Sequence, residues 1–125
     1  MRVVSSMMCA VAMLVALGSL SCAAATSPVA PVATPAGVRF VLANAEALSV
    51  ALAGSFNQWS ASSHPLRREK SRGVWTVVVT LPPGEHLFMY VVDGTRWISP
   101  PGAEDYVDDG FGARNGVVIV RAKER

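Results

Sequence analysis

The sequence predicts an all-β fold, a β-sandwich of about seven short strands. After Gly37, apolar and polar residues alternate with a period of two in one segment after another, the pattern of half-buried strands. Turn-forming combinations of Gly, Pro, Asn and Asp separate these segments about every ten residues. No part of this region has the period of an amphipathic helix. We therefore expect one folded domain over residues 37–125, with its last strand ending near Arg121.

The first 25 residues are typical of a signal peptide. Arg2 supplies a minimal positively charged N-terminal region, and residues 7–20 form an apolar segment of suitable length. The alanines at 23–25 then give the small-residue pattern of a cleavage site. We expect export to the periplasm or the medium, with cleavage after Ala25. Two alternatives remain open, an uncleaved membrane anchor and lipid attachment at Cys22, whose preceding residues match a lipidation signal poorly. Each alternative also puts the domain outside the cytoplasm.

A spacer is expected over residues 26–36, where Pro28, Pro31 and Pro35 are spaced among Val, Ala and Thr. Prolines at this density favour extended polyproline structure, because they lack backbone donors. The spacer needs no function beyond holding the domain away from a membrane or a partner.

The first two strands are predicted over residues 38–42 and over residues 48–52, the second beginning at Leu48. Gly54 then permits a turn, and Asn57 favours one by bonding its own backbone. The turn delivers Trp59 onto a loop. A tryptophan in this place can offer a flat apolar face to a ligand, or it can fold back over the sheet edge.

A short strand is predicted over residues 64–68, and the clearest strand of the chain over residues 74–81. Trp75 lies on the apolar face of that strand, so we expect it in the core. His86 begins the next strand beside Glu85, and we expect it at the surface or the sheet edge, because it has no partners that would make it a ligand.

Residues 86–92 form the next predicted strand, in which Phe88 and Tyr90 alternate with Met89. If the two rings face the core, Met89 faces outward on the sheet. Asp93 and Gly94 follow and give the strongest hairpin signal in the sequence. An acidic loop and a last strand over residues 116–120 complete the domain.

Composition excludes several classes of protein. The net charge is +2, which gives no indication of nucleic-acid binding. Cys9 and Cys22 both precede the domain, so we expect no disulfide framework. His64 and His86 have no cysteine partners with zinc spacing, and we expect neither a metal nor a cofactor.

Catalysis is not expected. Glycoside hydrolysis needs two carboxylates held in an enclosed cleft, whereas four of the nine carboxylate side chains of this chain gather in a loop flanked by Gly and Pro, which is typical of a solvated surface. They are Glu104, Asp105, Asp108 and Asp109. No nucleophile elbow, phosphate-binding glycine loop or metalloprotease motif is present.

Five motifs occur in order along the domain: LAGSFNQW (52–59), GVWTV (73–77), LPPGEH (81–86), YVVDG (90–94) and DGFGARN (109–115). Together they resemble the starch- and glycogen-binding module of carbohydrate-binding family forty-eight. That module occurs in the β-subunit of AMP-activated protein kinase and ahead of the catalytic domain in isoamylases and branching enzymes. The resemblance covers essentially the whole chain after the spacer. It implies an immunoglobulin-like, early-set sandwich and non-catalytic recognition of α-glucan.

The resemblance also implies the binding residues. Trp59 and Trp97 match the two platform tryptophans, although the segment before Trp97 is one residue longer than in the kinase subunit. Asn115 matches an asparagine that bonds sugar hydroxyls, and Phe111 takes the place of an apolar residue that threads against the glucan. Met89 stands where the kinase-type module has a lysine.

Two departures from the family pattern leave a rival hypothesis open. Met89 and Ala113, which replaces a threonine, both remove hydrogen-bonding groups. The same sandwich could therefore be a protein-interaction module with a decayed sugar site. A basic cluster that could meet an acidic protein partner supports this rival, although such charge runs are usually just solvated turns: Arg67, Arg68, Lys70 and Arg72. The retained Trp59, Trp97 and Asn115 favour glycan binding.

Overall fold

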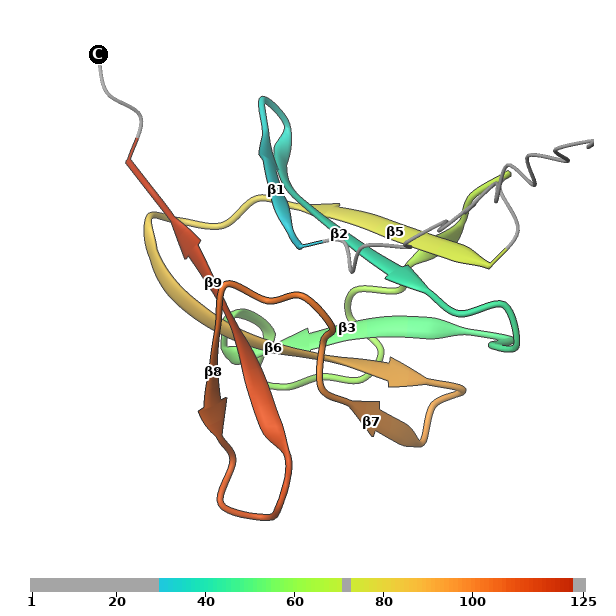
Figure 1. The fold of residues 1–125 in the computed structure, drawn as a ribbon. Helices are drawn as coiled ribbons and strands as arrows, with labels where there is room; N and C mark the ends of the chain where they lie inside the picture. The colour runs from blue at the N-terminus through green and yellow to red at the C-terminus, as the bar shows by residue number, and fades with distance from the viewer. Residues whose placement is uncertain (1–29, 71–72, 123–125) are drawn as a thin grey trace, which may run out of the picture.

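The computed structural model describes residues 30–70 and 73–122. The predicted signal peptide, the first part of the predicted spacer and Arg72 lie outside the described residues. Two antiparallel sheets pack as a sandwich, which confirms the predicted all-β class (Figure 1). Within the described ranges, no helix is long and apolar enough to cross a membrane.

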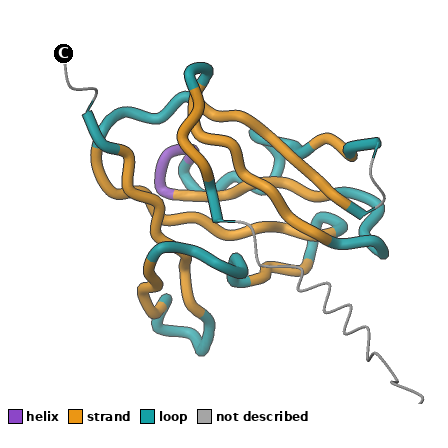
Figure 2. The backbone as a smooth tube through the Cα atoms, turned by 45° about the horizontal axis from the view of Figure 1, so that its top comes forward, coloured by secondary structure: helices purple, strands orange, loops and turns teal. Residues whose placement is uncertain are grey.

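The first sheet has the strand order β1-β2-β5-β4. Its strands are β1 (Val32–Thr34), β2 (Gly37–Ala43), β5 (Val74–Val79) and β4 (Arg67–Arg68). The second sheet has the order β3-β6-β9-β8, with β7 paired to the far end of β6. Its strands are β3 (Val50–Gly54), β6 (Gly84–Val92), β9 (Arg114–Val120), β8 (Asp105–Asp108) and β7 (Arg96–Ile98). The tube in Figure 2 shows η1 (Ser55–Asn57), a short helical turn that directly follows β3.

The core lies between the sheets because each central strand turns alternate apolar residues inward. Phe40 of β2 meets Phe88 of β6 edge to face, with ring centroids 5.0 Å apart. Tyr90 lies beside them, and its hydroxyl donates a hydrogen bond to the Val41 carbonyl of the opposite sheet at 3.2 Å. Burial of this phenol raises the pKa of Tyr90 well above its usual range. The bond ties the two layers together at the centre of the sandwich.

Trp75 lies in the core, as the strand pattern predicts. Its indole N–H donates to the Asn44 carbonyl at 3.0 Å, so the polar edge of the ring is satisfied. The guanidinium of Arg68 lies over the ring, 4.8 Å from its centroid, and donates to the Ala47 carbonyl. Trp75 therefore belongs to the core of the fold.

Some details differ from the sequence prediction, and the short strand expected over residues 64–68 is reduced to the two residues of β4. Leu48 is 83% exposed and precedes β3, which begins at Val50. The strand β1 lies inside the predicted spacer and pairs with β2, so that only part of the spacer can be extended polyproline. The predicted acidic loop contains the edge strand β8, which pairs with β9 from Asp105 to Asp108.

Candidate functional site

The outer face of the second sheet carries the candidate site. Along β6, Met89 and Val91 alternate with the core residues and therefore point away from the core. Ala53 of β3 lies opposite Met89, and Ala51 lies opposite Val91. The short side chains of Ala51 and Ala53 leave a depression in the outer face of the sheet, and the larger side chains around this depression form its walls.

An open groove of about 480 Å³ follows from this arrangement. It is lined by Trp59, Leu87, Met89, Trp97, Asp109, Phe111 and Asn115. The structure thus brings together all five site residues that the family resemblance implies, from three separate parts of the chain. Leu87 and Asp109 are additional lining residues that sequence reasoning did not select.

Trp59 forms one wall of the groove. It follows η1, and both Trp59 and Gln58 before it have positive φ angles, of 57° and 53°. The chain therefore turns sharply here. The half-buried ring packs against the small cluster of Ala51, Ala53 and Val91. Trp59 therefore does both things that its position allows, since it covers the sheet and also lines the groove.

Asn57 holds the Trp59 turn in place. Its buried side-chain oxygen accepts hydrogen bonds from the backbone N–H groups of Gly54 (3.0 Å) and Ser60 (3.2 Å). Its Nδ2 donates to the Leu52 carbonyl at 3.0 Å and lies 2.8 Å from Nδ1 of His64. A carbonyl only accepts and a backbone N–H only donates, so these partners fix which way the amide points.

His64 is therefore an acceptor at Nδ1, which places the ring proton of the neutral form on Nε2. The ring also meets Phe56 of η1 edge to face, with centroids 5.7 Å apart. Sequence reasoning noted the turn at Asn57 but missed this partnership. No local pattern signals it, because His64 belongs to the next segment and returns alongside β3.

Trp97 lies on β7, opposite Val91, and is 43% exposed. The hairpin that carries it turns at Asp93 and Gly94, whose φ angles of 54° and 76° are both positive, as the sequence signal predicts. The Asp93 carboxylate accepts the backbone N–H groups of Leu48 (2.8 Å) and Ser49 (3.1 Å). These bonds, with a smaller contribution from the charge of Arg96, hold the pKa of Asp93 below its usual range.

Phe111 stands at the tip of the β8–β9 hairpin and is 94% exposed. Asp109 Oδ1 accepts the backbone N–H groups of Phe111 (2.7 Å) and Ala113 (3.1 Å). Gly110 and Gly112 on either side have φ angles of 83° and 93°, which other residues rarely adopt. The loop thus presents an apolar ring to solvent on a braced turn, and Asn115 lies on β9 opposite Val107.

Met89 lies on the outer face of β6, as its alternation with Phe88 and Tyr90 predicts, but it is only 5% exposed. The side chains around it on that face cover it almost completely. It therefore forms part of the groove floor rather than projecting from the sheet. His86 lies outside the groove, with Nε2 2.8 Å from the Pro82 carbonyl.

Comparison with known proteins places the domain in a family. A family model described as the glycogen recognition site of AMP-activated protein kinase matches residues 39–125. A 1,4-alpha-glucan branching enzyme from Pseudomonas syringae pv. syringae is 40% identical over 65 residues, which are 51% of this chain and 9% of the enzyme. Another, from Bacillus caldolyticus, is 38% identical over 66 residues, 53% of this chain and 9% of the enzyme.

The relatives are much longer than this chain, which covers about a tenth of their length. Similarity to them is therefore confined to one region of each enzyme and says nothing of the remainder. The family model, in contrast, spans the folded domain nearly from end to end and includes every residue that lines the groove. The chain belongs to the family of the glycogen recognition site of AMP-activated protein kinase.

Proposed function

We propose that the domain is a non-catalytic module that binds α-glucans such as glycogen, starch or malto-oligosaccharides, with sugar rings stacked on Trp59 and Trp97. The observation that carries this proposal is the groove itself, in which two tryptophans, Phe111 and Asn115 meet. A pyranose has apolar C–H faces and a hydroxyl edge, so a binder needs aromatic planes together with a few fixed polar groups. Membership of a glycogen-recognition family supports the same ligand class.

The expected affinity is modest. Covering about 100 Å² of apolar surface on one tryptophan contributes on the order of 2.5 kcal/mol. Two such platforms and a few solvent-exposed hydrogen bonds correspond to dissociation constants in roughly the micromolar to millimolar range. Weak binding of this kind suits a polymer ligand, on which many sites can be occupied together.

Affinity electrophoresis through gels that contain glycogen tests the proposal. The wild-type domain should be retarded, and Trp97→Ala should weaken retardation at least about tenfold, because the stacking area on this ring is lost. Val78→Ala, which shortens an exposed residue on the first sheet, is the matched control and should migrate like the wild type. Wild-type migration that ignores glycogen would reject the proposal.

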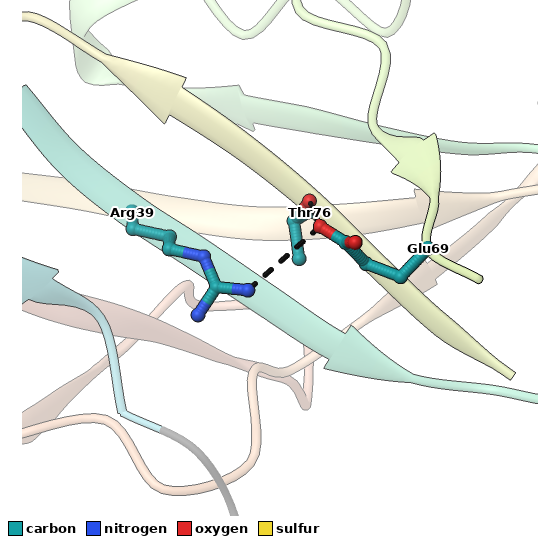
Figure 3. A network of polar contacts seen from close by, with 3 residues as sticks. All are labelled: Arg39, Glu69 and Thr76. Atoms are coloured by element: carbon teal, nitrogen blue, oxygen red, sulfur yellow. Dashed lines mark hydrogen bonds and ion pairs between the residues drawn. The ribbon is translucent and has the colours of Figure 1, made fainter. Parts of the chain in front are cut away.

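That negative result would favour the rival function, a protein-interaction module of the same fold. The observation behind the rival is the apolar Met89 in the groove, where the kinase-type module has a lysine. The basic cluster gives the rival little support, because Arg68 is engaged with Trp75 and the Ala47 carbonyl. Glu69 lies within the same run, pairs with Arg39 at 3.8 Å and accepts the Thr76 hydroxyl, so this surface carries an acidic side chain as well as basic ones (Figure 3).

Export completes the proposed function. The uncharged N-terminal run and the alanines at 23–25 support cleavage after Ala25, which would leave Thr26 as the first residue of the exported protein. Mass spectrometry of protein recovered from the periplasm or medium tests this. An intact Met1 would indicate an uncleaved anchor, and a lipid mass on Cys22 would indicate a lipoprotein.

A further inference from the structure

The floor of the groove is apolar, and apart from the indole N–H groups of the two tryptophans, the polar side chains of its lining lie on one side. Met89 is 5% exposed, whereas Trp97 and Phe111 are 43% and 94% exposed. Met89 therefore lies deep in the groove and the two rings lie at its rim, with half-buried Leu87 next along β6 on the same face. The polar lining residues, Asp109 and Asn115, both belong to the hairpin formed by β8 and β9.

This arrangement matters for a sugar that stacks on the rim. A pyranose that turns its C–H faces to the aromatic planes turns one edge, where its hydroxyls are, toward the floor. Leucine offers no hydrogen bond, and a methionine thioether is a weak acceptor that donates nothing. A hydroxyl placed against Met89 and Leu87 therefore loses its water without gaining a protein partner, which is unfavourable.

One of the two polar lining residues is also partly occupied. Asp109 Oδ1 accepts two backbone N–H groups of its own loop, so the binding capacity of this carboxylate is reduced. Asn115 can donate and accept through its amide, but it reaches a ligand only from its own side of the groove. The groove thus suits a ring with hydroxyls on one edge and apolar substituents on the other.

We propose that the preferred ligand is an O-methylated α-glucan, whose methyl groups on one ring edge contact half-buried Leu87 and the small exposed part of Met89. This inference rests on the proposed α-glucan binding and narrows its ligand class. A methyl cap removes the hydroxyl donor that the floor would leave unpaired, and it covers apolar surface on both side chains. The uncapped edge keeps its hydroxyls for Asn115.

Isothermal titration with β-cyclodextrin and with partially O-methylated β-cyclodextrin tests the inference. The methylated ring should bind about fourfold tighter for each methyl group that the floor covers. Equal or weaker binding of the methylated ring, with clear binding of the plain ring, overturns the inference and leaves the proposed function intact. Binding of neither ring, together with no retardation by glycogen, overturns both.

Substitutions identify the side chain responsible. Met89→Gln keeps the length of the side chain and adds an amide for a free hydroxyl, so the preference for the methylated ring should disappear or reverse. Met89→Leu keeps the floor apolar and should keep the preference. Val107→Gln makes the same kind of change at a position that is 46% exposed and outside the groove lining, and it should also keep the preference.

Two further variants guard against misleading outcomes. Phe111→Ala removes a ring that a cyclodextrin could enclose, and it should weaken both ligands without changing their ratio. If Met89→Gln fails to fold, Leu87→Gln places the amide at a half-buried position of the same floor and should abolish the preference. A folded variant of either residue with the wild-type ratio would overturn the assignment of the floor.

Discussion

At the scale of single residues, the two groove tryptophans should behave differently although both are proposed to stack sugar. Trp97 is exposed at the rim, whereas Trp59 covers Ala51 and Ala53. We expect Trp97→Ala to change the free energy of unfolding by less than about 0.5 kcal/mol, and Trp59→Ala to lower it by about 1–3 kcal/mol. Urea denaturation measures both values, and titration with maltoheptaose should show weakened binding in each variant. Equal stabilities would mean that Trp59 does not pack on the sheet in solution.

Asn57 is a positioning residue for Trp59, since it touches the loop and does not line the groove. Asn57→Ala leaves buried groups of Gly54 and Leu52 without their partner, and should lower the free energy of unfolding by about 2–4 kcal/mol. Urea denaturation is the measurement. The control is Asn115→Ala, which removes an amide from the groove and should cost less than about 1 kcal/mol. If both variants cost the same, the Asn57 bonds do not stabilise the loop.

At the scale of elements, the β6–β7 hairpin should make the domain sensitive to acid. The pKa of Asp93 is held low by the N–H groups of Leu48 and Ser49, so its stabilising contribution is present above its unfolded value of 3.8. That contribution is lost as the pH falls through the lower, folded value. Asp93→Asn keeps an acceptor and tolerates the positive φ, but it loses the charge.

We therefore expect Asp93→Asn to lower the melting temperature at pH 7 and to have little effect near about pH 2. Melting curves across this range check the sign of the effect. Asp108→Asn removes the same charge from an exposed position of β8 and serves as the control. A difference between wild type and Asp93→Asn that grows toward low pH would contradict the assigned direction of the pKa shift.

Elements also show where sequence reasoning succeeds. The strands with one face in the core, such as β2 and β5, were predictable because alternation with a period of two is their direct physical consequence. The same rule failed at Leu48, where the alternation continues past the end of the strand. The Leu48 N–H is bound by Asp93, which is 45 residues away in sequence. A contact of that range leaves no trace in a local pattern.

Edge strands were harder to predict for a related reason. The short strand β1 lies among prolines, and the side chains of β8 are exposed or only half-buried, so neither segment shows a clear apolar face. In the groove, the resemblance to a known family supplied Trp59, Trp97 and Asn115. It did not supply Leu87 or the pairing of Asn57 with His64, because these depend on how separate strands are placed in space.

At the scale of the whole molecule, the third tryptophan holds the sandwich together. Trp75 is buried among residues of both sheets, and Trp75→Ala should lower the free energy of unfolding by about 3–5 kcal/mol. That loss is a large part of the total stability of a small domain, which is about 5–15 kcal/mol. Chemical denaturation provides the measurement. A cost below about 1 kcal/mol would mean that the faces of β5 are inverted.

The C-terminal end of the described domain lies beside its first hairpin, close to the start of the domain. A pocket beside the β1–β2 hairpin is lined by residues 33–38 from one end and by Val120 and Arg121 from the other, and it shares no residue with the sugar groove. Chain ends that lie near one another allow a domain to be inserted into a loop of a host protein with little strain. They also allow circular permutation, in which the two ends are joined and the chain is opened at another loop. If the domain were inserted into a host protein through both ends, the groove would lie away from the points of attachment and would remain open to a ligand.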